Sequence, residues 1–108
     1  MKINYFLLFI AFAISALIGY GFWAGTENLY LVIGSTFLSF VTLSGILAVS
    51  FGRGSGNLKA LSVCFFTFSL IEHLIFAFVG FSQAPYIIIT GILVLVYVMI
   101  FYLIAKNL

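Results

Sequence analysis

Long runs of apolar residues, broken by few polar side chains, fill almost the whole chain. The runs cover Ile3–Ala24, Leu29–Phe51, Leu58–Phe81 and Ala84–Ala105. A helix needs about 20 apolar residues to cross a hydrocarbon core roughly 30 Å thick, and each run reaches that length. The pattern predicts an all-α membrane protein, with four transmembrane helices in two hairpins that form a single domain over residues 1–108.

The composition supports the same fold class. Hydrophobic residues make up 66% of the chain and charged residues only 6%, whereas a soluble domain carries charge on about a quarter of its residues. A membrane β-barrel would show segments of about ten residues with alternating polarity, and these runs are longer and apolar on every face. We therefore expect membrane lipid as the main surrounding partner and no nucleic-acid partner.

The positions of the charges predict the orientation in the membrane. Lys2 precedes the first run, Arg53 and Lys59 flank the second connector, and Lys106 follows the last run. The first connector contains the acidic Glu27, and the third is uncharged. Because basic residues favour the cytoplasmic side, we expect an inner-membrane protein with both termini in the cytoplasm.

The two halves of the chain resemble each other weakly. A shift of 56 residues aligns Phe9 with Phe65 and Tyr30 with Tyr86. Parallel repeats of this kind relate two halves of some transporters by an axis along the membrane normal. The alignment suggests an internal repeat of one hairpin, although chance explains many matches in a chain so rich in Phe and Ile.

Small residues recur at helical spacing within the runs and predict where the helices pack. Lipid gives transmembrane helices no hydrophobic reason to associate, so small residues mark their contacts. We expect helix packing at Ala11 and Gly19 in the first run, at Ser35, Thr42 and Gly45 in the second, and at Ser62 and Gly80 in the third. The fourth run has few small or polar residues, and we expect it to face lipid or a partner.

One pair of ionisable residues, Glu72 and His73, lies inside a run instead of at its end. A charged side chain is costly within the bilayer, so such residues face the protein interior or a cavity. Estimated depths place Ser15 and Ser39 in the same polar layer as Glu72, and Ser69 shares a stripe of the third helix with His73. Neighbours on a helix point about 100° apart, so we expect each of the pair to find its partner on another helix or subunit.

Several roles fit this pair. The first is structural, as hydrogen-bonded packing polars, and the second is a carboxylate that couples transport to protons or cations. A proton path or a quinone pocket at a subunit interface is a third. We predict no cofactor and no metal site, because His73 has no second ligand at useful spacing and would hold haem or a metal only with a partner's ligand.

The sequence favours an accessory or structural subunit of a larger membrane complex. It shows no arrangement of nucleophile and base, so we expect no enzymatic activity beyond that of a non-catalytic subunit. The alternative is a homo-oligomeric small transporter or channel, with Glu72 as its coupling carboxylate. Length and helix number resemble those of the small multidrug resistance exporters, but those carry their essential Glu in the first helix, where this chain has none. A holin-like pore former ranks below both.

Overall fold

Four helices make up most of the protein. The computed structural model describes residues 2–50 and 55–106. Its helices are α1 (Tyr5–Thr26), α2 (Leu29–Leu43), α3 (Ser55–Phe78) and α4 (Gln83–Lys106), and a π-helical turn over Ser44–Ala48 extends α2. All four, with α2 counted through Ala48, are long and apolar enough to cross a membrane. The prediction of four transmembrane helices is thereby confirmed.

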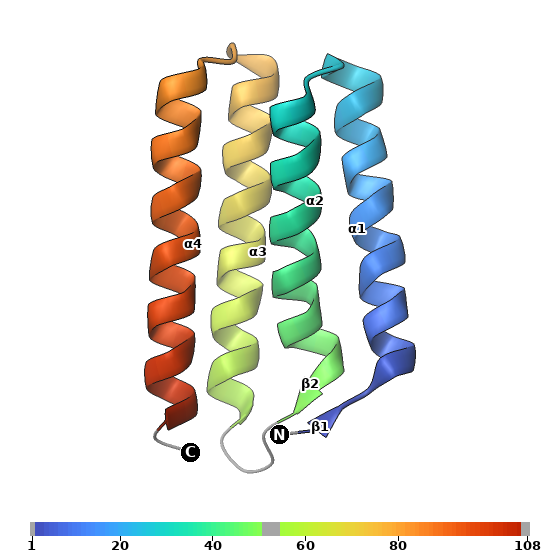
Figure 1. Cartoon of the computed structure of the whole chain (residues 1–108), viewed down its shortest axis with the longest axis vertical. Helices are drawn as coiled ribbons and strands as arrows, with labels where there is room; N and C mark the ends of the chain where they lie inside the picture. The colour runs from blue at the N-terminus through green and yellow to red at the C-terminus, as the bar shows by residue number, and fades with distance from the viewer. Residues whose placement is uncertain (1, 51–54, 107–108) are drawn as a thin grey trace.

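The helices stand side by side in the order in which they occur in the sequence (Figure 1). Each packs mainly against its neighbour in the chain, and the molecule measures 42 × 27 × 15 Å along its principal axes. Tyr86 of α4 also reaches past α3 to a backbone carbonyl of α2. Much of the surface of every helix therefore faces outward, and in a bilayer that surface meets lipid or another protein.

The start of α1 and the end of α2 are tied together by a short antiparallel ladder. Strand β1 (Lys2–Ile3) pairs with β2 (Val49–Ser50). The backbone N–H of Asn4 donates to the carbonyl of Ala48 at 2.8 Å, and its side-chain oxygen accepts the N–H of Leu7 as the N-cap of α1. We call this end of the molecule, where α1 begins and α4 ends, the strand end.

This ladder corrects the predicted bounds of the first two helices. The helical part of the first run begins at Tyr5 instead of Ile3, because Asn4 caps it. The α-helix of the second run ends at Leu43, since the chain widens into the π turn and then extends to form β2. The predicted end at Phe51 and the basic residue Arg53 lie outside the described residues.

At the opposite end, which we call the hairpin end, polar side chains set the turn between α1 and α2. Glu27 adopts a left-handed conformation (φ 52°) and donates its N–H to the carbonyl of Trp23. Thr26 Oγ1 accepts the N–H of Asn28, and Asn28 caps α2 by accepting the N–H of Tyr30 at 2.9 Å. Such left-handed and Asx caps close helix ends locally.

The turn between α3 and α4 overturns one packing prediction. Helix α3 ends at Phe78, short of the predicted Phe81, and Gly80 follows with a φ of 142° and open space around its Cα. Gly80 therefore serves the turn and does not belong to a helix-packing face. Pro85 lies in the first turn of α4, where a missing N–H costs little.

The other small residues predicted to pack are buried between helices. They are Ala11 and Gly19 in α1, Ser35 and Thr42 in α2, Gly45 in the π turn and Ser62 in α3. A Cβ at Gly19 would overlap Thr36 Oγ1 of α2, and a Cβ at Gly45 would lie 2.5 Å from Ser62 Oγ of α3. These glycines allow close approach of neighbouring backbones, which is how helices associate in lipid.

Substitution of Gly19 by alanine should destabilise the fold, whereas Gly21→Ala, in the same helix, should not. Both changes raise helix propensity equally, but Gly21 has open space where the new methyl group would lie. Overpacking costs about 1–3 kcal/mol, so we expect Gly19→Ala to unfold at a lower temperature in detergent. Equal melting temperatures for the two variants would contradict the α1–α2 packing described here.

Candidate functional site

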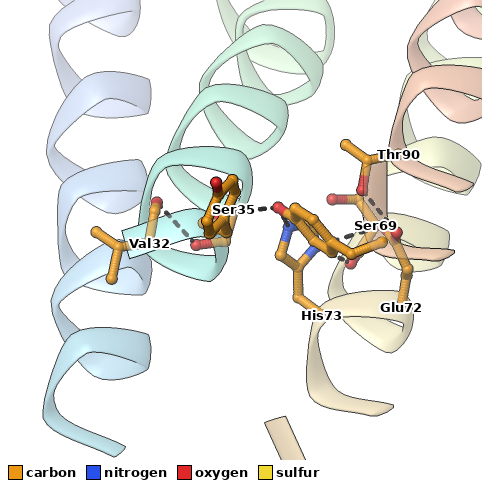
Figure 2. Close-up of polar contacts among 8 residues, drawn as sticks. Val32, Ser35, Ser69, Glu72, His73 and Thr90 are labelled. Carbon is orange, nitrogen blue, oxygen red and sulfur yellow. Dashed lines mark hydrogen bonds and ion pairs between the residues drawn. The ribbon is translucent and has the colours of Figure 1, made fainter. Parts of the chain in front are cut away.

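The two ionisable residues predicted inside the membrane span, Glu72 and His73 of α3, are buried and bonded to α4. Glu72 is 9% exposed and His73 is fully buried. Glu72 Oε2 accepts the hydroxyl hydrogen of Thr90 at 2.7 Å, and His73 Nε2 lies 2.9 Å from the Tyr86 hydroxyl. Figure 2 shows Glu72 and His73 on α3 with Thr90 close to the carboxylate. The expectation that each residue finds its partner on another helix agrees with these contacts.

The Tyr86 hydroxyl also joins α4 to α2. It donates to the backbone carbonyl of Tyr30 at 2.8 Å. Gly34 makes this possible, because a Cβ there would overlap the Tyr86 hydroxyl and lie 2.9 Å from His73 Nε2. Helices α2, α3 and α4 therefore meet at one point, the Tyr86 oxygen.

Aromatic rings enclose this meeting point. The Tyr86 ring lies 5.4 Å from the rings of His73, Phe76 and Phe81, measured between centroids. The ring of Phe22, from α1, stands edge-on to His73 at 5.8 Å. Offset and edge-on contacts of this kind add packing energy and exclude polar solvent, so the hydrogen bonds lie in an apolar surrounding.

The hydrogen bonds around His73 form a chain with three links. Nδ1 lies 2.8 Å from the carbonyl of Ser69, Nε2 lies 2.9 Å from the Tyr86 oxygen, and that hydroxyl reaches the carbonyl of Tyr30. A carbonyl only accepts, so the first link needs a hydrogen on Nδ1 and the last needs the hydrogen of Tyr86.

The number of hydrogens decides the protonation of the site. A neutral His73 and Tyr86 bring two hydrogens to the three links, so one link stays open, and an imidazolium would bring the third hydrogen. Glu72 Oε1 lies 3.5 Å from Nδ1, so a proton from Glu72 can reach Nδ1 but not Nε2. Its transfer would close the chain and create an ion pair when the neutral ring carries its hydrogen on Nε2. The Glu72–His73 pair therefore has a neutral and an ionised proton arrangement.

Three buried polar atoms near this chain have no hydrogen-bond partner among the described residues. They are Glu72 Oε1, Ser69 Oγ and Ser39 Oγ. Gly34 of α2 lies against His73 of α3, and Gly45 lies against Ser62, so the antiparallel register of the two helices brings Ser39 level with Ser69. An unsatisfied buried polar atom costs about 1–3 kcal/mol, so these oxygens are the energetically unfavourable members of the polar layer.

A groove between α2 and α4 leads to the site from outside. Its volume is about 550 Å³, and Gly34, Tyr86 and Thr90 line its inner part, with Leu29, Ile33 and Ile87 around them. Thr90 bonds Glu72 directly, so an apolar molecule in the groove would lie one side chain away from the carboxylate.

Ser15, another predicted member of this layer, is buried and bonds within its own helix. Its hydroxyl donates to the carbonyl of Ala11 in α1, and no described contact joins it to Glu72. Sequence reasoning missed Tyr86, Thr90 and Tyr30. Tyr86, Thr90 and Tyr97 share one face of α4 at spacings of four and seven residues, and that polar stripe is the signal that marks the face toward α3.

The side chains around His73 determine whether this residue is free to hold a metal or haem. Among residues 2–50 and 55–106, no three His, Cys, Asp or Glu side chains gather closely enough to hold a metal ion. Both ring nitrogens of His73 already have partners inside the chain. A haem or metal on His73 would have to displace Tyr86 or the Ser69 carbonyl.

Comparison of the chain with protein-family models, with curated proteins and with solved structures found no match.

Removal of the Tyr86 hydroxyl should destabilise the protein. Tyr86→Phe loses two hydrogen bonds and leaves His73 Nε2 buried without a partner, which costs about 1–3 kcal/mol. Tyr102→Phe is the matched control, because Tyr102 lies on the same helix and is 62% exposed. Thermal unfolding in detergent measures both. If Tyr86→Phe has the same melting temperature as the wild type, the Tyr86 hydroxyl does not hold the three helices together.

Proposed function

We propose that this protein is a non-catalytic, structural subunit of a larger membrane-embedded complex. One observation carries the proposal: the intramembrane polar side chains bind the protein's own helices. Glu72 bonds Thr90, His73 bonds Tyr86, and Ser62 bonds Tyr97 at 2.6 Å. Side chains used in this way hold α4 against α3, while the outer surface stays apolar.

The shape of the molecule supports the same role. A single row of helices leaves broad outward faces, and α4 is the least buried of the four. Its buried residues, Tyr86 and Tyr97, lie on the face toward α3, and side chains such as Ile88, Ile92 and Leu95 point away from it. A face of this kind suits contact with lipid and with the helices of a larger protein.

The membrane and the orientation belong to the same proposal. Lys2, Lys59 and Lys106 all lie at the strand end of the molecule (Figure 1), and basic residues favour the cytoplasmic side. We assign this end to the cytoplasm of a bacterial-type inner membrane. The two hairpins, α1–α2 and α3–α4, would descend from one duplicated hairpin in which only the second acquired the Glu72–His73 pair.

To test the proposal, the tagged chain is purified from its host in mild detergent. Native mass spectrometry then identifies what is bound to it. We expect a larger membrane protein in fixed ratio to the chain. Glu72→Gln should keep this association, because the amide oxygen still accepts the Thr90 hydrogen. Glu72→Ala should weaken it, since loss of that bond costs about 1–3 kcal/mol.

Recovery of a stable homo-oligomer alone would contradict a subunit role. Equal recovery of the complex with Glu72→Ala would show that the α3–α4 contact does not matter for assembly.

A second function is favoured by a different observation. The hydrogen-bond chain through His73 lacks one hydrogen, and it lies beside oxygens of Glu72 and Ser69 that have no hydrogen-bond partner among the described residues. In a homo-oligomeric transporter or channel, Glu72 would exchange its proton with a cation or substrate that enters along the groove to Thr90. Oε1 of Glu72 and Oγ of Ser69, which have no hydrogen-bond partner among the described residues, would supply the first ligands. This proton exchange would use the two proton arrangements of the Glu72–His73 pair.

Reconstitution in liposomes tests this second function. If it holds, the wild type should carry a proton-coupled flux of cations, and Glu72→Gln should abolish it while the melting temperature stays unchanged. The glutamine preserves the Thr90 contact but cannot exchange a proton. A flux of equal size in Glu72→Gln, or none in the wild type, would reject Glu72 as a coupling carboxylate.

A further inference from the structure

A hollow of about 600 Å³ lies at the strand end, away from the Glu72–His73 site. Lys2 and Lys59 line it together with Asn4 and Tyr5, and the side chains of Leu7 and Leu47 form apolar parts of its wall. The hollow thus combines two cations with an apolar wall at the edge of the predicted membrane span.

The fold brings these two lysines together from distant parts of the sequence. Lys2 is held by the β1–β2 ladder, in which it pairs with Ser50. Lys59 stands near the beginning of α3. The hydrogen bond from Asn4 N–H to the Ala48 carbonyl closes the ladder against the π turn, so the backbone under Lys2 has a defined place beside Lys59.

No side-chain carboxylate of the chain neutralises this pair. The chain has two acidic side chains: Glu27 lies in the turn at the hairpin end, and Glu72 is bonded to Thr90 within the span. The Asn4 side-chain oxygen is used by the α1 cap, which leaves its NH₂ group as a donor. Two cations and an amide donor together call for an anion with several acceptor oxygens.

We propose that this hollow binds the headgroup phosphate of an anionic phospholipid. Lys2 and Lys59 pair with the phosphate, Asn4 donates to it, and Leu7 and Leu47 contact the first part of an acyl chain. The apolar wall favours a lipid over free phosphate, which would leave that wall uncovered. The net charge of the pair favours an anionic lipid over a zwitterionic one, with each lysine near the surface contributing about 1 kcal/mol.

Titration of the purified protein with phosphatidylglycerol, read by native mass spectrometry, tests the site. The variant Lys2→Gln/Lys59→Gln should bind the lipid roughly 10- to 30-fold more weakly than the wild type, as expected for two such lysines. Lys106→Gln is the control, because Lys106 lies at the same end of the molecule but does not line the hollow. We expect its affinity to change by less than about twofold.

Two further probes separate the sources of phosphate. Phosphatidylcholine should bind more weakly than phosphatidylglycerol, and inorganic phosphate at equal concentration should not displace the lipid. Equal loss of affinity in the double variant and in Lys106→Gln would overturn the proposal. Equal binding of the two lipids, or displacement of the lipid by inorganic phosphate, would overturn it as well. Circular dichroism of the double variant should match the wild type, and a lost helical signal with retained lipid affinity would also reject the site.

Discussion

The hydrocarbon of a lipid bilayer offers no hydrogen bonds, and the arrangement of helices α2, α3 and α4 follows from that constraint. Exposure of Glu72 and His73 to lipid would cost a large free energy, so their hydrogen-bond partners must come from the protein. Those partners are Thr90 and Tyr86 of α4, and Tyr86 in turn binds the Tyr30 carbonyl of α2. One hydroxyl of α4 therefore contacts both α3 and α2.

Close approach of the backbones makes these bonds achievable. Gly34 leaves room for the Tyr86 hydroxyl, and Gly45 leaves room beside the Ser62–Tyr97 contact. Toward the strand end of the α3–α4 interface lies the Ser62–Tyr97 contact, and toward the hairpin end lie the bonds of Glu72 and His73 to α4. Helix α4 can therefore neither slide nor rotate on α3 without breaking a bond. Packing of small residues sets the distance between helices, and the hydrogen bonds set their register.

The same network connects stability with chemistry. Among the residues that the structure describes, Glu72 Oε1 and Ser69 Oγ have no hydrogen-bond partner. The three hydrogen bonds around His73 need one hydrogen more than neutral His73 and Tyr86 supply. Structural clamping and proton exchange are compatible uses of one carboxylate. A subunit whose polar groups first served packing would need few changes to acquire an exchangeable proton, since the groove to Thr90 already reaches the network.

The sequence by itself determined the membrane class, the four helices and the burial of Glu72 and His73, because hydrocarbon imposes length and polarity rules that act on each segment separately. It also located the small residues that pack, apart from Gly80, which the end of α3 at Phe78 places in a turn. Only the tertiary structure decided which groups meet. Tyr86 and Thr90 become partners of His73 and Glu72 only when α4 lies against α3. Likewise, only the structure shows that the Ser15 hydroxyl bonds the Ala11 carbonyl of its own helix. Lys2 and Lys59 share a hollow only because the β1–β2 ladder closes the strand end. These pairings depend on the rotation and register of whole helices, which no single segment of the sequence specifies.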